Sequence, residues 1–107
     1  MTGPIVFSDE TARTQLVEEG IVVTFRSTER TTGSTWWRRS RTGEKAGDCH
    51  VGHIGRVEWG DFVRMLGQYV ALSGFESVDA WAEAITELNG ALSPGHLYRV
   101  TTEDYDE

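Results

Sequence analysis

The first half of the chain alternates short apolar runs with polar segments, which predicts strands around a single helix. Residues 4–7 (PIVF) form an apolar run of strand type, and residues 21–26 (IVVTFR) are rich in the β-branched and aromatic side chains of a buried strand. Between them, residues 8–20 predict a helix that Ser8 caps and Gly20 ends. The apolar face of this helix is thin and consists of Ala12, Leu16 and Val17.

A hairpin is predicted next. Residues 34–41 (STWWRRSR) show the alternation of a strand, and residues 42–48 (TGEKAGD) supply turn residues. Residues 49–59 return as a second strand, in which Gly52 and Gly55 are expected to mark bulges. The alternation places Trp36, Arg38 and Ser40 on one face of the first strand, and Trp37, Arg39 and Arg41 on the other.

The second half of the chain predicts two helices. Behind Asp61, apolar residues recur at helical spacing, although Gly67 weakens this helix. These residues are Phe62, Met65, Leu66 and Tyr69. Ser77 is expected to cap a second helix that ends at Gly90. The inward stripe of this second helix consists of Val78, Trp81, Ile85 and Leu88.

The order of the elements indicates the fold class. Residues 96–102 (HLYRVTT) predict a last strand, and residues 103–107 a frayed acidic tail. The order is then strand, helix, three strands, two helices, strand. Helices around a mostly antiparallel sheet define an α+β domain, and a small curved sheet of about five strands can close toward a barrel. No repeat or linker divides residues 1–107, so we predict a single domain.

The charge balance is acidic and includes almost no lysine. Asp and Glu number 17 against 10 basic residues, nine of them Arg, and the formal net charge is −7. This bias is typical of proteins that live in concentrated salt, and a GC-rich genome produces it too. No apolar run approaches a bilayer span, and the first residues lack the layout of a signal peptide. Together with the single Cys49, these features predict a cytoplasmic protein that makes no membrane contact.

Positive charge is concentrated in one segment, residues 26–45. It contains six basic and two acidic residues, a local net charge of +4. The basic residues are Arg26, Arg30, Arg38, Arg39, Arg41 and Lys45. One indole of the Trp36–Trp37 pair can stack on a base, worth roughly 1–3 kcal/mol, while guanidiniums contact phosphate. The alternative is that the tryptophans fill the core and the arginines pair with surplus acids.

Cys49, His50 and His53 raise the question of a metal site. On a strand, Cys49 and His53 share a face while His50 points away, and His96 could add one ligand from the last strand. A closed tetrahedral zinc site needs more converging ligands than two, so the alternative of surface histidines and a buried thiol is favoured. The glycine motifs that bind the phosphates of nucleoside triphosphates or dinucleotides are missing. We therefore expect neither a metal nor a cofactor.

Several short stretches, in their order and spacing, resemble the ASCH domain, a member of the PUA-like group of small β-barrels. They are TFR (24–26), KAGD (45–48), LSGFESVDAWAEAITELNG (72–90) and LYRV (97–100), and the resemblance covers residues 4–102. The resemblance implies a curved barrel with a cleft near the TFR strand. It also implies a role in RNA binding, RNA processing or nucleoside chemistry.

One enzymatic branch of this family removes the acyl group from N4-acetylcytidine, using a lysine, a threonine and a glutamate. The resemblance aligns the threonine with Thr24 and a following arginine with Arg26. The lysine position falls on Ile21, and the glutamate position falls on or near Gly74. Thr24 therefore lacks both neighbours that would activate its hydroxyl, and Glu76 is the nearest substitute for the glutamate.

We predict an ASCH-type domain that binds RNA or a nucleotide, with a cleft that recognises a single-stranded RNA element or a modified nucleobase. The predicted contacts are Thr24, Arg26, Arg30, Trp36, Trp37, Arg38, Arg39, Arg41 and Lys45. Long duplex DNA is not expected as a partner, because an acidic body repels an extended phosphate backbone. Two alternatives stay open: an amide hydrolase or ribonuclease with Thr24 as its weak catalytic candidate, and a protein-interaction module anchored by aromatic side chains.

Overall fold

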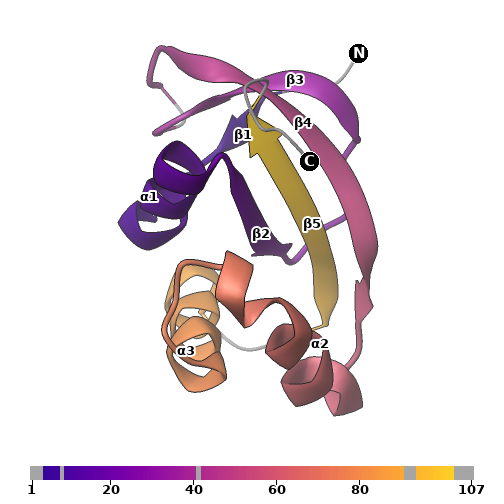
Figure 1. Cartoon of the computed structure of the whole chain (residues 1–107). Coiled ribbons are helices and arrows are strands. Elements are labelled where there is room, and N and C mark those ends of the chain that lie inside the picture. Colours follow the sequence, from indigo (N-terminus) through magenta and orange to yellow (C-terminus); the bar gives the residue numbers. More distant parts are fainter. Residues whose placement is uncertain (1–3, 8, 41, 91–93, 103–107) are drawn as a thin grey trace.

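The computed structural model describes residues 4–7, 9–40, 42–90 and 94–102. The elements follow the predicted order (Figure 1). The strands are β1 (Ile5–Val6), β2 (Ile21–Arg26), β3 (Gly33–Arg38), β4 (Lys45–Val57) and β5 (Gly95–Thr102). The helices are α1 (Glu10–Glu19), α2 (Phe62–Tyr69) and α3 (Val78–Asn89), with short 3-10 turns η1 (Trp59–Asp61) and η2 (Val70–Leu72) on either side of α2. The chain is therefore an α+β protein, as predicted.

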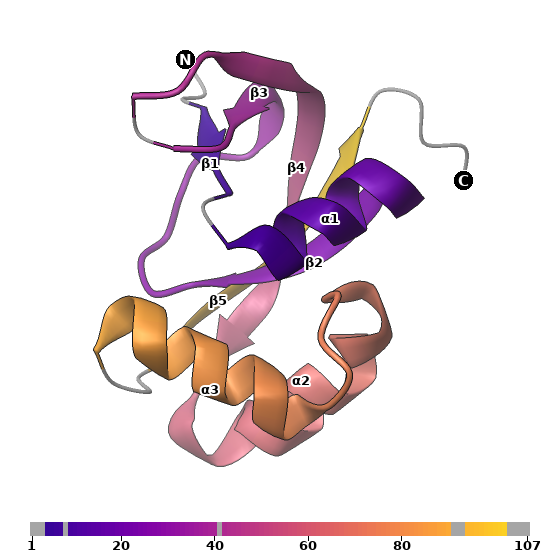
Figure 2. The same cartoon turned by 90° about the vertical axis from the view of Figure 1, so that its left-hand side faces the viewer.

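One sheet of five strands, in the order β1-β3-β4-β5-β2, organises the fold. β1 pairs in parallel with β3, and the other neighbouring strands pair antiparallel. The sheet curls into a half-barrel whose two edge strands, β1 and β2, lie near α1, the helix that connects them (Figures 1 and 2). The prediction of a curved, barrel-like sheet is confirmed at this level.

Helix α1 has a clear cap at each end. The Asp9 carboxylate accepts hydrogen bonds from two backbone N–H groups of the first turn, and Gly20 ends the helix at a φ of 77°. The predicted cap, Ser8, lies outside the described residues. Leu16 is buried as predicted, but Val17 is 60% exposed, so its assignment to the apolar face was wrong. Each helical residue turns by about 100°, which carries Val17 away from the stripe that faces the sheet.

The β3–β4 hairpin differs from the prediction in its boundaries. β3 ends at Arg38 rather than at residue 41, and β4 begins at Lys45, inside the predicted turn. A register shift between Trp37 and Arg38 marks the end of regular pairing. Gly47 pairs with Trp37, and a Cβ at Gly47 would lie 3.0 Å from the indole nitrogen. Glycine therefore lets β4 pass close to the indole and extends the ladder into the predicted turn.

Helices α2 and α3 cover one face of the curled sheet and form a core with it. The buried residues of this core are Val23, Phe25, Val57, Phe62, Leu66, Trp81, Ile85 and Leu97, and Met65, Tyr69 and Val78 pack against it. Ser77 caps α3 by accepting a hydrogen bond from the Ala80 N–H, and Gly90 ends it at a φ of 78°. The side chain of Leu88 lies outside the described ones. None of the described helices is long and apolar enough to cross a membrane.

The opposite face of the sheet, which we call the inner face, packs against α1 and β1. Its core consists of Ile5, Phe7, Ala12, Leu16, Val22, Trp37, Cys49, Val51, Tyr98 and Val100. Phe7 follows β1 directly, and its N–H donates a hydrogen bond of 2.9 Å to the Arg38 carbonyl oxygen. The inner face is therefore apolar toward α1 and β1, and its polar residues lie along β2, β5 and β4.

Candidate functional site

The register of three neighbouring strands arranges polar side chains in two rows on the inner face. Cross-strand partners point to the same face of a sheet, so the register alone defines each row. The first row, which we call the inner basic row, consists of Arg26 on β2, His96 on β5 and Arg56 on β4. The adjacent row consists of Thr24, Tyr98 and His53. Two predicted contacts, Thr24 and Arg26, thus lie beside four residues that were not predicted as contacts.

A bulge in β4 brings Arg56 into the inner basic row. The register shifts between His53 and Gly55, so β4 has an extra residue there. In a regular strand, Arg56 would point to the face opposite His53, because alternation reverses over three positions. The bulge predicted at Gly55 is confirmed, whereas Gly52 pairs regularly with Arg99 and its predicted bulge was wrong.

Arg26 reaches across the open side of the half-barrel. Its Nη2 donates a hydrogen bond of 2.9 Å to the Val6 carbonyl oxygen of β1, and its guanidinium carbon lies 5.2 Å from the centre of the Phe7 ring. Its Nε is buried and has no hydrogen-bond partner among the described residues. No carboxylate of the described residues forms an ion pair with Arg26. The guanidinium is held in position, and none of the described side chains supplies a compensating anion.

Burial and a neighbouring cation oppose the charge of Arg26. Burial, and to a lesser extent Arg30, lowers the pKa of Arg26 to about 10. Burial also lowers the pKa of Arg30, while Cys49 and Tyr98 act in the opposite direction. Guanidiniums stay protonated in proteins, so the lowered pKa reports a charge that its surroundings stabilise poorly. An anion beside both arginines would offset the cost of burying their charge.

The loop after β2 places Arg30 against the inner face. Its backbone N–H donates a hydrogen bond of 2.8 Å to the phenolic oxygen of Tyr98, which is fully buried. Cys49 lies on the same face, and burial raises the pKa of its thiol to about 11, with a smaller opposing effect from Arg30. Cys49 is therefore a protonated thiol at neutral pH, which makes it a poor nucleophile.

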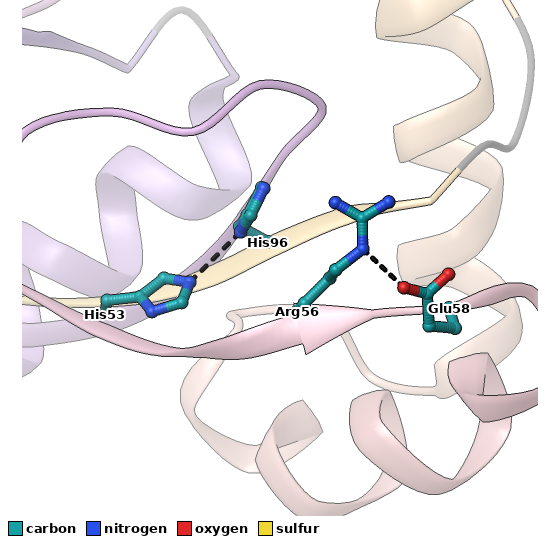
Figure 3. Close-up of polar contacts among 4 residues, drawn as sticks. All are labelled: His53, Arg56, Glu58 and His96. Atoms are coloured by element: carbon teal, nitrogen blue, oxygen red, sulfur yellow. Dashed lines mark hydrogen bonds and ion pairs between the residues drawn. The ribbon is translucent and has the colours of Figure 1, made fainter.

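His53 and His96 contact each other on the inner face (Figure 3). His53 Nε2 and His96 Nδ1 are 3.1 Å apart, and the tautomers decide which nitrogen donates. Both rings lie beside Tyr98, with ring centres 5.2 Å away for His53 and 6.2 Å for His96. His96 is buried and His53 is exposed. Arg56 stands next to them and donates a hydrogen bond from its Nε to the Glu58 carboxylate (Figure 3).

The histidines and the cysteine do not assemble a metal site in the part of the chain that is described. As the alternation predicts, Cys49 lies on the inner face with His53, and His50 is exposed on the other face. Among the described residues, no three or more metal-ligating side chains come together. The arginines around the His53–His96 pair also give this face the wrong sign for a cation.

The tryptophan pair is divided between core and surface. Trp37 is buried edge-to-face against Phe7, with ring centres 6.1 Å apart. Trp36 points to the other face of β3 and is half-buried, and the Arg38 guanidinium lies over its ring, 5.5 Å from the centre. The Nε of Arg38 is buried without a hydrogen-bond partner among the described residues. Trp36 and Arg38 form what we call the outer tryptophan surface.

The structure distributes the predicted contacts over several places rather than one cleft. Thr24, Arg26 and Arg30 belong to the inner face, and Trp36 and Arg38 form the outer tryptophan surface. Arg39 is exposed just past the end of β3. Trp37 belongs to the core. Lys45 is exposed and forms an ion pair of 2.7 Å with Asp48. Arg41 lies outside the described residues.

Thr24 is buried and borders a cavity of about 40 Å³ beside the β2 edge, between α1 and α3. Such a space suits a water molecule rather than a nucleobase. The two positions that the resemblance aligns with the lysine and the glutamate of the acetylcytidine hydrolases suit neither residue. Ile21 is buried, and a Cβ at Gly74 would lie 2.7 Å from the Thr11 carbonyl oxygen, at a φ of +90° that favours glycine. Glu76 is exposed, so neither aligned position supplies a base beside the buried Thr24.

Sequence reasoning missed His53, His96, Tyr98 and Arg56 as neighbours of Arg26. It considered the two histidines only as metal ligands, and it left Arg56 and Tyr98 without a role. Their placement depends on which residues of three strands are partners, and on the bulge that changes the phase of β4. One signal was available: polar and aromatic residues alternate with apolar ones in β2 and β5, at Thr24, Arg26, His96 and Tyr98.

The inner face combines two kinds of chemical group. Guanidiniums and protonated imidazoles bind phosphate oxygens, and aromatic rings stack on bases. The two rows contain no carboxylate, so the face as a whole attracts anions.

No protein-family model, curated protein or solved structure matches the chain.

Proposed function

We propose that this chain is an ASCH-type, PUA-like domain that binds a nucleotide or a short single-stranded RNA segment on its inner face. The observation that carries the proposal is Arg26, whose buried Nε has no hydrogen-bond partner and which contacts no carboxylate among the described residues. A guanidinium in such surroundings destabilises the protein unless an anion compensates it. Phosphate is an anion whose oxygens match the guanidinium fork.

The aromatic side chains beside the arginines favour a nucleobase over a bare anion. His53 is exposed, and its ring packs 5.2 Å from the centre of Tyr98, so its free side offers a stacking surface. Arg30 lies next to the same tyrosine through its backbone hydrogen bond. Stacking of a base on an aromatic ring contributes roughly 1–3 kcal/mol, and single strands expose their bases for it.

The charge distribution favours a short ligand. The whole chain carries −7, so a long polyanion would be repelled outside the basic segment. The outer tryptophan surface offers a second contact, with Arg38 stacked over Trp36. We expect this surface to contact RNA segments that extend past the first nucleotide, and mononucleotides to use the inner face alone.

The test is an NMR titration of the isotope-labelled protein with cytidine, N4-acetylcytidine, mononucleotides and short single-stranded RNA. Signals of Thr24, Arg26 and Arg30 are expected to shift with saturable binding. Arg30→Gln should weaken nucleotide binding about tenfold, because a charge-assisted hydrogen bond is lost. The matched control is Arg64→Gln, which removes an exposed arginine on α2 and should leave binding unchanged. If no ligand changes the chemical shifts of the inner-face residues, the proposal is refuted.

The same samples distinguish the proposed function from its two alternatives, an enzyme and a protein-interaction module. Release of acetate from N4-acetylcytidine would identify a hydrolase and would require a base that the two aligned positions lack. A protein-interaction module would bind its partner through Trp36, with little effect of the Arg30 substitution. Binding of RNA through phosphate contacts weakens steeply as salt is added, whereas apolar docking does not.

A further inference from the structure

The inner basic row indicates which chemical group of the ligand the protein recognises. This inference rests on the proposed function. We propose that Arg26, His96 and Arg56, with His53, form a subsite for a terminal phosphate, and that the His53–His96 pair takes up a proton when this phosphate binds. The ligand class is then a nucleoside monophosphate or an RNA end that carries one. The proton comes from solvent, and no covalent bond forms or breaks.

The geometry places two cationic side chains on either side of the imidazole pair. His96 is the cross-strand partner of Arg26 on one side and of Arg56 on the other. His53 contacts His96 from the adjacent row through the 3.1 Å nitrogen–nitrogen contact (Figure 3). His53 and Arg56 are both exposed, so a ligand can reach this part of the inner face from solvent.

The hydrogen bond between the imidazoles limits their charge in the free protein. One ring nitrogen donates and the other must accept with a free lone pair, so the two rings cannot both be imidazolium while this contact exists. The groups that face the pair are Arg26 from β2, Arg30 from the next loop, Cys49, Arg56 and its partner Glu58 from the β4 side, and Tyr98 from β5. Most of the charge on these described groups is positive, so a bound anion meets little competing negative charge here.

A terminal phosphate reverses this balance. Its dianion places negative charge beside the imidazoles, which favours imidazolium, and its three free oxygens accept hydrogen bonds from rings and guanidiniums together. An internal phosphodiester has a single negative charge and two free oxygens, and a nucleoside has none. The subsite should therefore rank a nucleoside monophosphate above a dinucleotide without a terminal phosphate, and both above the nucleoside.

The experiment compares cytidine, cytidine 5′-monophosphate, a cytidine dinucleotide without terminal phosphate, and inorganic phosphate. Imidazole proton signals are followed by NMR against pH with and without each ligand. The monophosphate should raise the pH midpoints of the His53 and His96 signals by about one unit, the effect of an opposite charge at close range. His50 is the internal control, since it is exposed on the opposite face of β4 and its midpoint should not move.

Two matched pairs of variants locate the effect. His53→Gln keeps a polar group near the Nε2 position but cannot take up a proton, and it should weaken monophosphate binding about tenfold. His50→Gln, the same exchange on the opposite face, should have no effect. Arg56→Gln should also weaken monophosphate binding, whereas Arg64→Gln, whose arginine is ion-paired to Asp61 on the surface, should not. His50→Gln, Arg56→Gln and Arg64→Gln should leave the affinity for cytidine unchanged, whereas His53→Gln also removes the proposed stacking ring and should weaken cytidine binding as well.

The outcomes separate this inference from the proposed function. If cytidine and its monophosphate bind with equal affinity and the His53 and His96 midpoints stay fixed, the terminal-phosphate subsite is refuted while nucleobase binding stands. If inorganic phosphate alone produces the midpoint shifts and the nucleoside adds no affinity, the subsite is supported and nucleotide binding is refuted. If no ligand affects the inner face, both fail.

Discussion

Trp36 and Trp37 are neighbours in sequence with opposite surroundings. Trp37 is 5% exposed and packs edge-to-face against Phe7, while Trp36 lies on the other face of β3 under the Arg38 guanidinium. Alternation along a strand predicts that the two indoles separate, but it does not say which one is buried. The buried one is decided by Phe7, which follows β1 and packs against Trp37 on the inner face.

This difference predicts unequal effects of truncation. Trp37→Ala should lower the free energy of unfolding by about 3–5 kcal/mol, because a large buried side chain leaves a cavity. Trp36→Ala should lower it by about 1 kcal/mol, because only a half-buried ring and a cation–π contact are lost. Urea unfolding followed by circular dichroism gives both values. Equal losses would contradict the assignment of Trp37 to the core.

Helix α1 depends on its ends more than its sequence suggests, because few of its residues are buried. Its buried residues are Ala12 and Leu16, together smaller than the Trp81 and Ile85 that α3 buries, so packing contributes less than in α3. The Asp9 carboxylate satisfies two N–H groups of the first turn, and Gly20 provides the left-handed conformation that ends the helix. The caps are therefore a substantial part of what stabilises α1.

Removal of the N-terminal cap tests this dependence. Asp9→Ala should lower the free energy of unfolding by about 1 kcal/mol, since a cap carboxylate and a favourable charge at the helix N-terminus are lost. Glu19→Ala is the control at the other end of α1, where a negative charge opposes the helix dipole, and it should be neutral or slightly stabilising. Thermal or urea unfolding measures both. A loss at Glu19 as large as that at Asp9 would rule out the capping account.

The elements with local signals were predictable from the sequence. The β-branched run of residues 21–26 gave β2 with the observed bounds, and Ser77 and Gly90 gave the ends of α3. The exposure of Val17 could not be predicted, because it depends on how α1 sits on the sheet. The end of β3 could not be predicted either, because it depends on a register shift beside Trp37. Local propensity cannot report either contact.

The candidate site was less predictable than the elements that build it. Thr24 and Arg26 came from a family resemblance, and their position on the inner face is fixed by partners on β5. Arg56 joins them only because the bulge near Gly55 shifts the phase of β4. A sequence shows alternation within one strand, but the rows of a site run across strands, so they depend on register.

The molecule as a whole carries an excess of negative charge that surface ion pairs relieve only slightly. The formal net charge is −7, and the Lys45–Asp48, Arg56–Glu58 and Arg64–Asp61 pairs are all exposed to solvent. Exposed pairs contribute little to stability, so repulsion among the remaining acids acts against the folded state.

Salt should therefore stabilise the fold while weakening the proposed binding. Raising KCl from about 0.1 M to 1 M shortens the Debye length from about 10 Å to 3 Å, and the melting temperature should rise by about 5 °C or more. Nucleotide affinity should fall over the same range. A variant with Glu18→Gln and Glu83→Gln, both exposed, should gain less from salt. A melting temperature that is independent of salt would contradict this account.

The bond from Arg26 to the Val6 carbonyl has a consequence for how the half-barrel opens. Among the described residues, β1 and β2 are the two ends of the strand order, and this side chain joins them where no backbone ladder does. A closed barrel opens only when many backbone hydrogen bonds break together, whereas a joint made by one guanidinium can open by a rotamer change. We therefore expect the width of the inner face to depend on this single side chain, which is also the proposed ligand contact.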